Sequence, residues 1–495
     1  MSQYFLGLDN GGTVTKAAIF DMENGDIKGI SSIKTKIIFP KPHYTEKDIN
    51  ILWGANIKVI KEVLEKSKIN GEDILGMSIT GHGNGLYLSD GNGNAVYNGI
   101  ISTDLRAESY LKNIDFKSLR KHTYQDLWAG QTSVLLKWFK DNEKDIMDKT
   151  KYIFLCKDFL RYKFTKEPYI EISDISGTNL LDNNTLNYND EILQILGIEE
   201  YKDKFPKIVK PCDLCGYITD EISKLTGLKK KLPVYAGLFD ITACAIASGT
   251  IDDSVLSIVV GTWGINQYIS KNILKTPVWM TSIFCKDNYY LNTEASPTSA
   301  SNLEWFVNNL YSEEIKNTNN IFKYCDETIK KNNNVSEKLI FMPFLYGSNV
   351  VPTSGGGFLG VEAHNQKQDL LLAVYEGIIF SHKYHIDKFK SPPYKVIRLS
   401  GGASKSSIWC QMFADILGMR IEVLNGEEFG ALGCAITASI GFGLYNSYDD
   451  AVRKIIKIKN VYEPNPANRD YYLNKYNNYL KIISSMEDYW NSFIL

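Results

Sequence analysis

Residues 4–21 read YFLGLDNGGTVTKAAIFD: an apolar strand at 4–8, a polar turn rich in glycine, and a second strand at 15–21. A hairpin signal, NGD at residues 24–26, follows, and residues 27–35 have the composition of a third strand. Three strands joined by short turns predict an antiparallel meander. A dinucleotide-binding fold would instead begin with a strand, a turn and a helix.

A stretch in the middle of the chain has the same format. Residues 255–260 form an apolar strand, GTWG at 261–264 forms a turn, and residues 265–269 return as a second strand. This internal repeat predicts an α/β protein with two similar halves. The length agrees, because 495 residues with 44% hydrophobic content are too many for a single core.

Other segments supply the expected connections. Thr45 is expected to cap a helix, with Asp48 as the acid of a capping box, and apolar residues between 49 and 64 fall on one face of that helix. A strand is expected at 74–79, and the loop TGHGNG at 80–85 leaves its backbone open to another molecule. Further helices are expected from Asp240 to about residue 248, from near Ser406 toward residue 417, and over residues 431–440.

Bulk composition narrows the class of protein. The net charge of −2 and the lack of a basic block argue against nucleic-acid binding. No apolar run reaches the length of a membrane span. Residues 1–21 lack the pattern of a secretory signal. We therefore expect a cytoplasmic protein whose partners are small molecules, with no nucleic acid and no membrane involved.

The first turn carries a combination suited to a metal–nucleotide. Asp9 ends a buried strand directly before Asn10, and Gly11, Gly12 and Thr13 follow. The glycine amides and the threonine hydroxyl can bind phosphate oxygens, and the aspartate can hold Mg²⁺, mainly through water. Lys16 can add positive charge near the transferred phosphoryl group. The alternative is an ordinary hairpin whose aspartate only shapes the turn.

Two further turns fit the same ligand. Gly261 and Thr262 match the Gly/Thr pattern of the first turn. Two such turns that face each other can bind one triphosphate from both sides. A flat adenine or ribose can lie against Gly401-Gly402-Ala403, just before the helix that begins near Ser406. Each turn alone is equally compatible with a purely structural role. Neither a P-loop nor the glycine-rich loop of protein kinases occurs in the sequence.

Asp240 is the candidate catalytic base. It lies between Phe239 and Ile241 in a stretch of apolar and small residues, where a carboxylate is costly to bury without a purpose. A general base for phosphoryl transfer must reach the acceptor hydroxyl, and an aspartate at the start of a helix suits that task. The alternative, equally compatible with the residue chemistry, is a helix N-cap.

Together and in this order, these motifs resemble those of the FGGY carbohydrate kinase family. The matching stretches are GLDNGGT at 7–13, GLFD at 237–240, GTW at 261–263 and SGGA at 400–403. The resemblance implies two ribonuclease-H-like domains, as in actin-like ATPases, flanking a deep cleft. It assigns residues 1–246 to an N-terminal domain that binds most of the sugar and carries the base. Residues 247–495 then form a C-terminal domain that binds most of the ATP.

Within the family, the chain most resembles the L-xylulose kinase branch. The stretches behind this are GNGLYL at 83–88, IISTDLRA at 100–107, EASPTS at 294–299, NLEWF at 302–306 and FLYGSN at 344–349. The resemblance implies an ATP-dependent kinase that phosphorylates a terminal hydroxyl of L-xylulose or a related ketopentose. Kinases for D-xylulose, ribulose, erythritol or glycerol share the scaffold and stay open as alternatives. The family also suggests a homodimer.

The resemblance assigns roles to single residues. Asp240 takes the proton from the sugar hydroxyl and contacts the sugar together with His82, Gly83 and Asp104, while Asp9 and Mg²⁺ organise the phosphates. The residues expected to bind ATP are Gly11, Gly12, Thr13, Lys16, Gly261, Thr262, Gly401, Gly402, Ala403 and Ser406. An actin-like ATPase switch would share the phosphate turns, but Asp240 and the 80–85 loop fit a small polyol acceptor.

Overall fold

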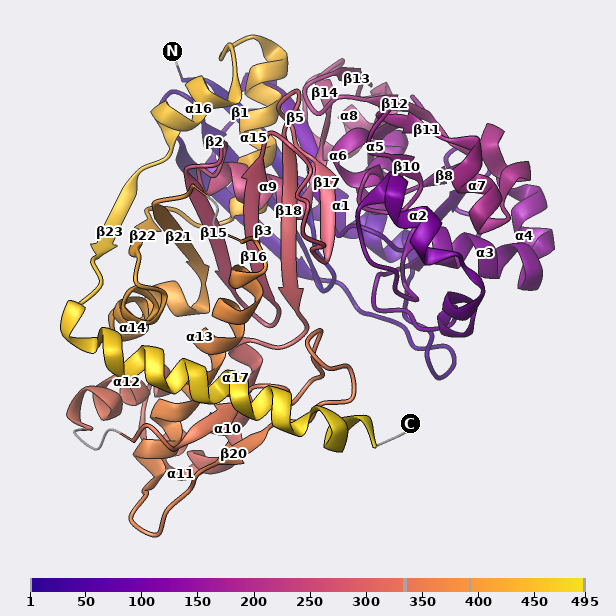
Figure 1. Ribbon diagram of the computed structural model, residues 1–495. Coiled ribbons are helices and arrows are strands. Elements are labelled where there is room, and N and C mark those ends of the chain that lie inside the picture. The colour runs from indigo at the N-terminus through magenta and orange to yellow at the C-terminus, as the bar shows by residue number, and fades with distance from the viewer. Residues whose placement is uncertain (1, 333–335, 391–392, 493–495) are drawn as a thin grey trace.

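The computed structural model describes residues 2–332, 336–390 and 393–492 and contains one large mixed sheet in each half of the chain (Figure 1). The strands of the N-terminal sheet lie in the order β13 (Leu214–Tyr217), β14 (Pro233–Phe239), β5 (Ile74–Gly81), β1 (Tyr4–Asn10), β2 (Val14–Asp21) and β3 (Asp26–Lys34). β1, β2 and β3 form the predicted antiparallel meander. β5 runs parallel to β1, and β14 runs parallel to β5.

The C-terminal sheet repeats this topology. Its strands lie in the order β17 (Met280–Ile283), β18 (Tyr290–Ser296), β16 (Gly264–Ser270), β15 (Val255–Val260), β21 (Val396–Gly401), β22 (Arg420–Leu424) and β23 (Ile458–Tyr462). β15, β16 and β18 correspond to β1, β2 and β3, and the parallel strands β21 and β22 correspond to β5 and β14. The internal repeat is therefore confirmed, and β17 is an addition at the edge of the second meander.

Helices cover both faces of the N-terminal sheet, which explains why β1 and β5 are buried along most of their length. α1 (Ile49–Ser67) packs on one face through residues that include Val59, Ile60 and Val63. Its start differs from the prediction. Asp48 caps the helix, because its carboxylate accepts the amides of the second and third helical residues at 2.8 and 3.1 Å. Thr45 is not the cap.

The chain before α1 is extended where a first helical turn had been expected. Glu46–Lys47 form the short strand β4, which pairs with β7 (Gly99–Ile100). Extended pairing of this dipeptide moves the helix start to Asp48 and turns the side chains of Glu46 and Lys47 into the protein, where both are buried. The three charged residues of the motif TEKD therefore differ in position: Glu46 and Lys47 are buried inside the protein, and Asp48 caps α1.

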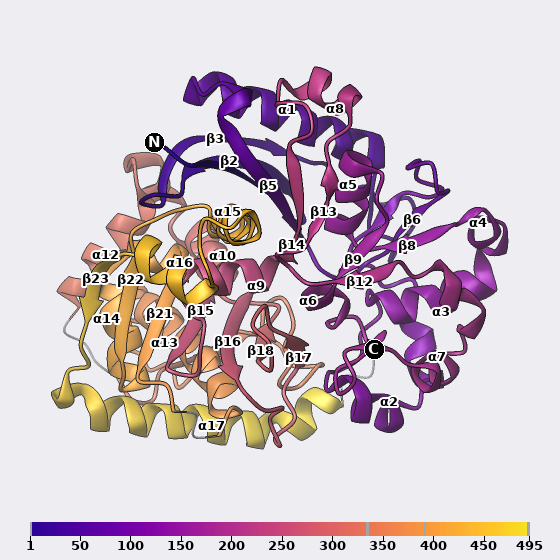
Figure 2. The same ribbon diagram turned by 90° about the horizontal axis from the view of Figure 1, so that it is seen from above.

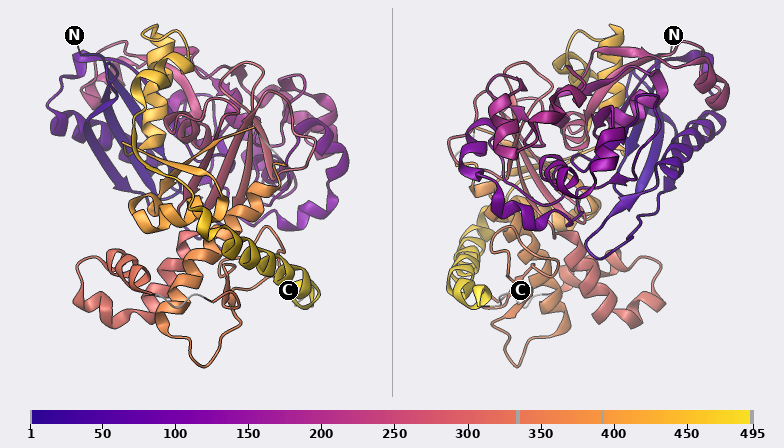
Figure 3. Two further views of the ribbon diagram at one scale, coloured as in Figure 1. Left: turned by 60° about the vertical axis from the view of Figure 1, so that its left-hand side comes forward. Right: turned by 90° about the vertical axis from the view of Figure 1, so that its right-hand side faces the viewer.

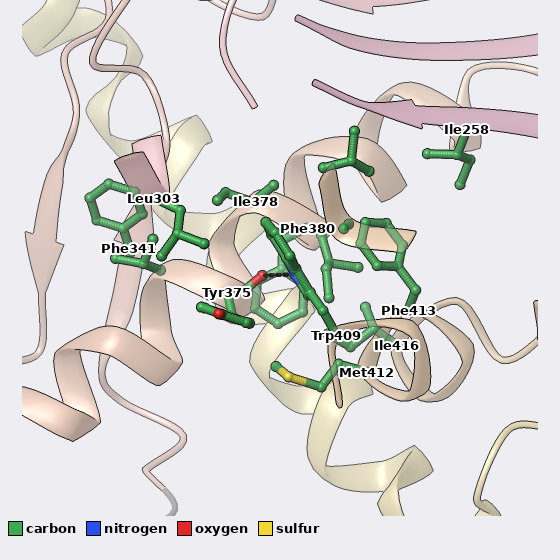
Figure 4. Packing of buried hydrophobic residues seen from close by; sticks show 14 of the residues in the cluster. Ile258, Leu303, Phe341, Tyr375, Ile378, Phe380, Trp409, Met412, Phe413 and Ile416 are labelled. Atoms are coloured by element: carbon green, nitrogen blue, oxygen red, sulfur yellow. Dashed lines mark hydrogen bonds between the residues drawn. The ribbon is translucent and has the colours of Figure 1, made fainter. Parts of the chain in front are cut away.

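The core of the C-terminal half lies between its sheet and two helices, α13 (Lys367–Asp387) and α14 (Ser407–Leu417). Figure 4 shows the contact, with Tyr375 of α13 against Trp409 of α14 and Phe413 in the same cluster. The rings of Tyr375 and Trp409 have centroids 4.6 Å apart. This packing fixes the start of α14 against the end of β21.

Two helices lie between the sheets (Figure 2). α9 (Asp240–Ala247) follows β14, and α15 (Phe429–Phe442) confirms the helix predicted over residues 431–440. Although α15 belongs to the C-terminal half of the chain, it packs against β1, β5 and β14 of the N-terminal sheet. A Cβ added at Gly433 of α15 would lie 2.3 Å from the carbonyl oxygen of Ala243 in α9, so only glycine allows this close contact.

A helical lobe extends the N-terminal half on the right of Figure 1. It has its own apolar cluster and contains α2 (Phe116–Thr123), α3 (Thr132–Asn142), α4 (Lys144–Lys149) and α7 (Asp190–Leu196). The lobe is tied to the edge of the C-terminal sheet. The amide of Asp126 donates to the carbonyl of Trp279 at 2.9 Å, and the amide of Thr281 donates to that of Tyr124 at 3.2 Å.

The last helix closes the C-terminal half. α17 (Arg469–Asn491), yellow in Figure 3, lies against that half, and Lys475 of α17 pairs with Glu376 of α13 at 2.6 Å. Both side chains of this pair are buried. Within the described part of the chain, no helix combines the length and apolar content needed to cross a bilayer.

Candidate active site

The predicted catalytic residues gather where the parallel strands of the N-terminal sheet end. Asp9 on β1 lies opposite Thr80 on β5, and the last residues of β5 and β14 lie opposite each other. His82 and Asp240 are the next residues after those strand ends. This edge, at the carboxyl ends of parallel strands, is where open α/β sheets bind ligands.

Asp9 is a partly buried carboxylate at the start of the glycine turn. Burial raises its pKa to about 6, against the opposing effect of the Lys16 ammonium. α15 approaches so closely that a Cβ added at Gly430 would lie 2.5 Å from Asp9 Oδ2. Gly430 thus leaves the room that the carboxylate occupies. Nothing in the sequence pattern linked Gly430 to Asp9, because the two residues come from opposite halves of the chain.

Asp240 is the first residue of α9, and one of its oxygens accepts the amide of Ile241 at 2.7 Å. Burial and, to a smaller extent, the negative charge of Asp9 together raise its pKa to about 7. Phe239 occupies the N-cap position, so Asp240 is not the cap that the alternative interpretation required. A carboxyl group that titrates near neutrality suits a general base.

A bulge in β14 sets the course of the backbone just before Asp240. Between Tyr235 and Leu238 the register against β5 shifts, so that β14 carries one extra residue. Gly237 lies in this bulge with φ +85°, and a Cβ there would lie 2.0 Å from the carbonyl oxygen of Ile79. Glycine is therefore required at this position, three residues before the carboxylate.

Side chains replace the ladder hydrogen bonds that the bulge removes. Arg161 donates to the Ala236 carbonyl at 2.7 Å, Thr80 donates to the Leu238 carbonyl at 2.7 Å, and the Phe239 amide donates to Ser173 Oγ at 3.2 Å. The backbone leading into Asp240 is thus held from three directions.

One of these anchors, Arg161, belongs to a buried cluster of charges that sequence reasoning missed, and a second, Ser173, is hydrogen-bonded to it. The cluster comprises Lys157, Asp158, Arg161, Glu171 and Asp174, and none of the five side chains is more than marginally exposed. Lys157 Nζ lies 2.9, 3.4 and 3.5 Å from oxygens of the three acids, and Arg161 pairs with Asp158 at 2.6 Å. Glu171 accepts the Ser173 hydroxyl at 2.8 Å. The motif KDFLR at 157–161, which places three charges within about one helical turn next to apolar residues, was the available signal.

His82 is a neutral, buried imidazole. Its Nε2 lies 2.8 Å from the Tyr87 hydroxyl, and burial lowers its pKa to about 3. Its Nδ1 has no hydrogen-bond partner among the described residues. The next residue, Gly83, lies against the ring of Phe239, where a Cβ would lie 2.1 Å from the nearest ring atom. The loop therefore packs directly beside β14, the strand that ends just before Asp240.

Asp104 is held differently from the other predicted sugar contacts. Its carboxylate is fully buried and accepts four donors: the Thr45 amide at 2.6 Å, the Arg106 amide at 3.0 Å, Arg106 Nε at 2.8 Å and Arg106 Nη2 at 2.9 Å. Direct contact with a sugar would require one of these donors to leave. In this structure Asp104 orients Arg106, which also reaches Glu46 at 2.7 Å.

The two turns of the C-terminal half meet at one sheet edge. Val260, the last residue of β15, lies opposite Gly401, the last residue of β21. Gly401 has φ +83°, and a Cβ there would lie 2.4 Å from the Val260 carbonyl oxygen. The carbonyls of Gly261 and Thr262 accept amides at the start of α10 (Ala300–Leu310). The predicted phosphate and adenosine turns are therefore neighbours.

Family models and relatives agree with this arrangement. A model of the N-terminal domain of the FGGY family of carbohydrate kinases matches residues 4–247, and a model of its C-terminal domain matches residues 256–442. The chain is 34% identical to a probable L-xylulose kinase of Haemophilus influenzae, over 98% of this chain and 99% of that protein. The chain belongs to the FGGY family of carbohydrate kinases.

Other relatives of this carbohydrate kinase are similar over their whole length. An L-xylulose/3-keto-L-gulonate kinase of Escherichia coli is 32% identical, over 99% of this chain and 98% of that protein. The crystal structure of a ligand-bound xylulose kinase from Lactobacillus acidophilus superposes with a TM-score of 0.92 at 22% identity, covering 99% of this chain and 100% of that one. The second similarity establishes the two-domain fold, as in actin-like ATPases.

Two predicted ATP ligands of the kinase have their polar groups engaged within the protein. Ser406 caps α14: its hydroxyl accepts the Trp409 amide at 3.1 Å and donates to Asp326 at 2.8 Å. Its own amide donates to the Ala403 carbonyl at 3.0 Å, so a contact with ATP would have to displace one of these partners. The Lys16 ammonium pairs with Glu428 at 2.8 Å, and this ion pair links β2 to the residue before α15. Lys16 would have to exchange that partner for phosphate.

The donor set near Asp9 fits a magnesium ion that arrives with the nucleotide. No group of three or more His, Cys, Asp or Glu side chains that could hold a metal occurs among the residues the structure describes. Mg²⁺ commonly binds proteins through one or two carboxylates, with water and substrate phosphates completing its shell. Asp9, in the space left by Gly430, provides such a carboxylate.

Proposed function

We propose that this kinase transfers the γ-phosphate of ATP to a terminal hydroxyl of L-xylulose or a closely related ketopentose. The observation that carries the reaction is Asp240, with its pKa near 7, beside Asp9 and the glycine turn at one sheet edge. The names of the relatives support the sugar class.

In the proposed mechanism, Asp240 accepts the proton of the sugar hydroxyl. At the same time the hydroxyl oxygen of the sugar attacks the γ-phosphorus, and ADP leaves. His82 and Gly83 line the sugar side, and Asp104 keeps Arg106 in place there. Asp9 would hold Mg²⁺, which would supply charge neutralisation at the phosphates. The remaining catalysis is positioning and charge, as is general for phosphoryl transfer.

We assign the nucleotide to both halves. The first turn (Gly11, Gly12, Thr13) and Lys16 face the phosphates from residues 1–246, and the other turns face the nucleotide from residues 247–495. The C-terminal contacts are those of Gly261, Thr262, Gly401, Gly402, Ala403 and Ser406. On the family resemblance, we also expect a cytoplasmic homodimer, which light scattering after size exclusion tests.

The substrate is tested by coupled ADP release with L-xylulose, D-xylulose, L-ribulose, 3-keto-L-gulonate, erythritol and glycerol. We expect the highest kcat/KM with L-xylulose or one of the other ketoses. Because a site built to hydrogen-bond a given hydroxyl rejects analogues that lack it by a large factor, the preference should be steep. Equal turnover of glycerol and the ketopentoses would overturn the proposed substrate class.

ATP hydrolysis without sugar is expected to be much slower than sugar phosphorylation. Closure of the two halves over the sugar would exclude water and complete the site only when the acceptor is bound. The rate of phosphate release with ATP alone, compared with ADP release after sugar is added, measures the difference. Equal rates would contradict the kinase mechanism and favour an ATPase switch.

The activity is expected to depend on pH with a midpoint near 7. Asp240 must be ionised to accept the proton, and burial raises its pKa to about 7, so kcat/KM should fall as the pH drops below that value. Initial rates with coupling enzymes in excess, taken from about pH 5 to about pH 9, measure the profile. A flat profile through neutrality would argue against Asp240 as the base.

A further inference from the structure

Lys47 is a buried lysine directly behind the first glycine turn. Its side chain is 1% exposed, and its Nζ donates to the Gly11 carbonyl at 2.9 Å and to Thr35 Oγ1 at 3.1 Å. The pairing of β4 with β7 turns Lys47 into the protein at this point. No part of the mechanism above uses it.

The Lys47 ammonium has no partner acid in the part of the chain that the structure describes. Among the described residues, no carboxylate lies within 4.0 Å of Lys47 Nζ, whereas the buried Lys157 and Lys475 each pair with at least one acid. The two acids next to Lys47 in the chain are committed elsewhere, Glu46 to Arg106 and Asp48 to the cap of α1. Burial lowers the pKa of Lys47.

A buried cation without a partner acid lowers the stability of the folded protein. A function for Lys47 would explain why it occupies this position despite that cost. The Gly11 carbonyl that accepts the hydrogen bond from Lys47 belongs to the same peptide group as the Gly12 amide. A trans peptide points its C=O and N–H in opposite directions, so a cation on the oxygen side directs the Gly12 amide outward. A Cβ added at Gly12 meets no atom within 4 Å, so the outer side of the turn is open to a ligand.

We propose that Lys47 is a positioning residue for the nucleotide, a buried counter-charge that orients the Gly11–Gly12 peptide toward the terminal phosphates and is neutralised only when they bind. The proposal rests on the assignment of this turn to phosphate, made above. Lys47 acts through the peptide, and the triphosphate takes the place of the missing acid. Its charge also reaches the other side of the site, where it helps to lower the pKa of His82.

The test compares nucleotides that differ in charge. Calorimetry gives the dissociation constants of ATP, ADP and adenosine for wild type, Lys47→Met, which removes charge and hydrogen bond, and Lys47→Gln, which retains a donor. In both variants we expect ATP binding to weaken by roughly ten- to a hundredfold, ADP binding to weaken less, and adenosine binding to stay unchanged. Lys58→Met, on the exposed face of α1, is the control and should leave all three unchanged.

Thermal unfolding without nucleotide gives the second readout. We expect Lys47→Met and Lys47→Gln to melt at or above the wild-type temperature, because they remove an unpaired buried charge. Unchanged ATP affinity, or equal losses for ATP and adenosine, would overturn the inference. If Lys47→Gln retains full ATP affinity, the role of the charge is overturned. If wild type phosphorylates sugar and the variants bind ATP normally, only this inference fails; if wild type binds no ATP, the proposed function fails as well.

Discussion

Asp240→Asn is expected to lower kcat for sugar phosphorylation by about a hundred- to ten-thousandfold while changing KM for ATP little. The amide keeps the shape of the carboxylate but cannot accept the proton of the sugar hydroxyl. The hydrogen bond from the Ile241 amide at 2.7 Å can pass to the amide oxygen, so the start of α9 should survive. Coupled ADP release on the best ketose measures the loss.

The same variant has a distinctive effect on stability. The folded pKa of Asp240, about 7, lies above its ordinary value, so the folded state binds this proton more tightly and the carboxyl group costs stability as the pH rises from about 4 to about 7. Asp240→Asn should therefore melt higher than wild type at about pH 8 and show little gain at about pH 4. Asp190→Asn, at an exposed position, should change neither activity nor melting. Normal turnover in Asp240→Asn would remove the residue from the mechanism.

Arg161→Ala is expected to lower the free energy of unfolding by about 3–5 kcal/mol, the usual result of breaking a buried ion pair from one side. The change leaves Asp158 with less compensation and removes the donors to the Ala236 and Tyr169 carbonyls, at 2.7 and 2.6 Å. The backbone that leads into Asp240 loses one of its anchors, so kcat should fall as well.

Urea unfolding compares the loss of stability in Arg161→Ala, which removes a buried charge, with that in Arg420→Ala, which removes a partly exposed one. Arg420 is 40% exposed and pairs with the exposed Glu463 and with the buried Glu422, which keeps Arg398 as a second partner, so removal of Arg420 should cost less than about 1 kcal/mol. Arg161→Met, which keeps the volume and loses the charge, shows whether packing alone suffices. Equal unfolding curves for Arg161→Ala and Arg420→Ala would show that the charge cluster contributes nothing particular to stability.

Much of the framework is predictable because its signals are local. Alternating and apolar strands joined by glycine turns predicted both meanders, and their repetition predicted two similar sheets, which the structure confirms. The helix start at Thr45 was wrong because β4 pairs with β7, a contact with residues about fifty positions away that no local pattern shows.

The parts of the site that the sequence did not predict depend on distant contacts. Gly430 shapes the surroundings of Asp9 from the far end of the chain, and Arg161 supports the bulge at Gly237 from another helix. The carboxylate of Asp104 was expected to face the sugar, but Arg106, two residues away, occupies it. No local pattern linked Gly430 or Arg161 to the site, and for Asp104 the acidic side chain was evident but its partner was not.

The position of α15 bears on how this protein is made. During synthesis the N-terminal sheet leaves the ribosome first, yet the helix that covers its second face, residues 429–442, is translated near the end. Until then β1 and β5 expose one apolar face, and a chain released at the boundary between the two family models would keep that face exposed. The N-terminal sheet is therefore covered on both faces only when translation is almost complete.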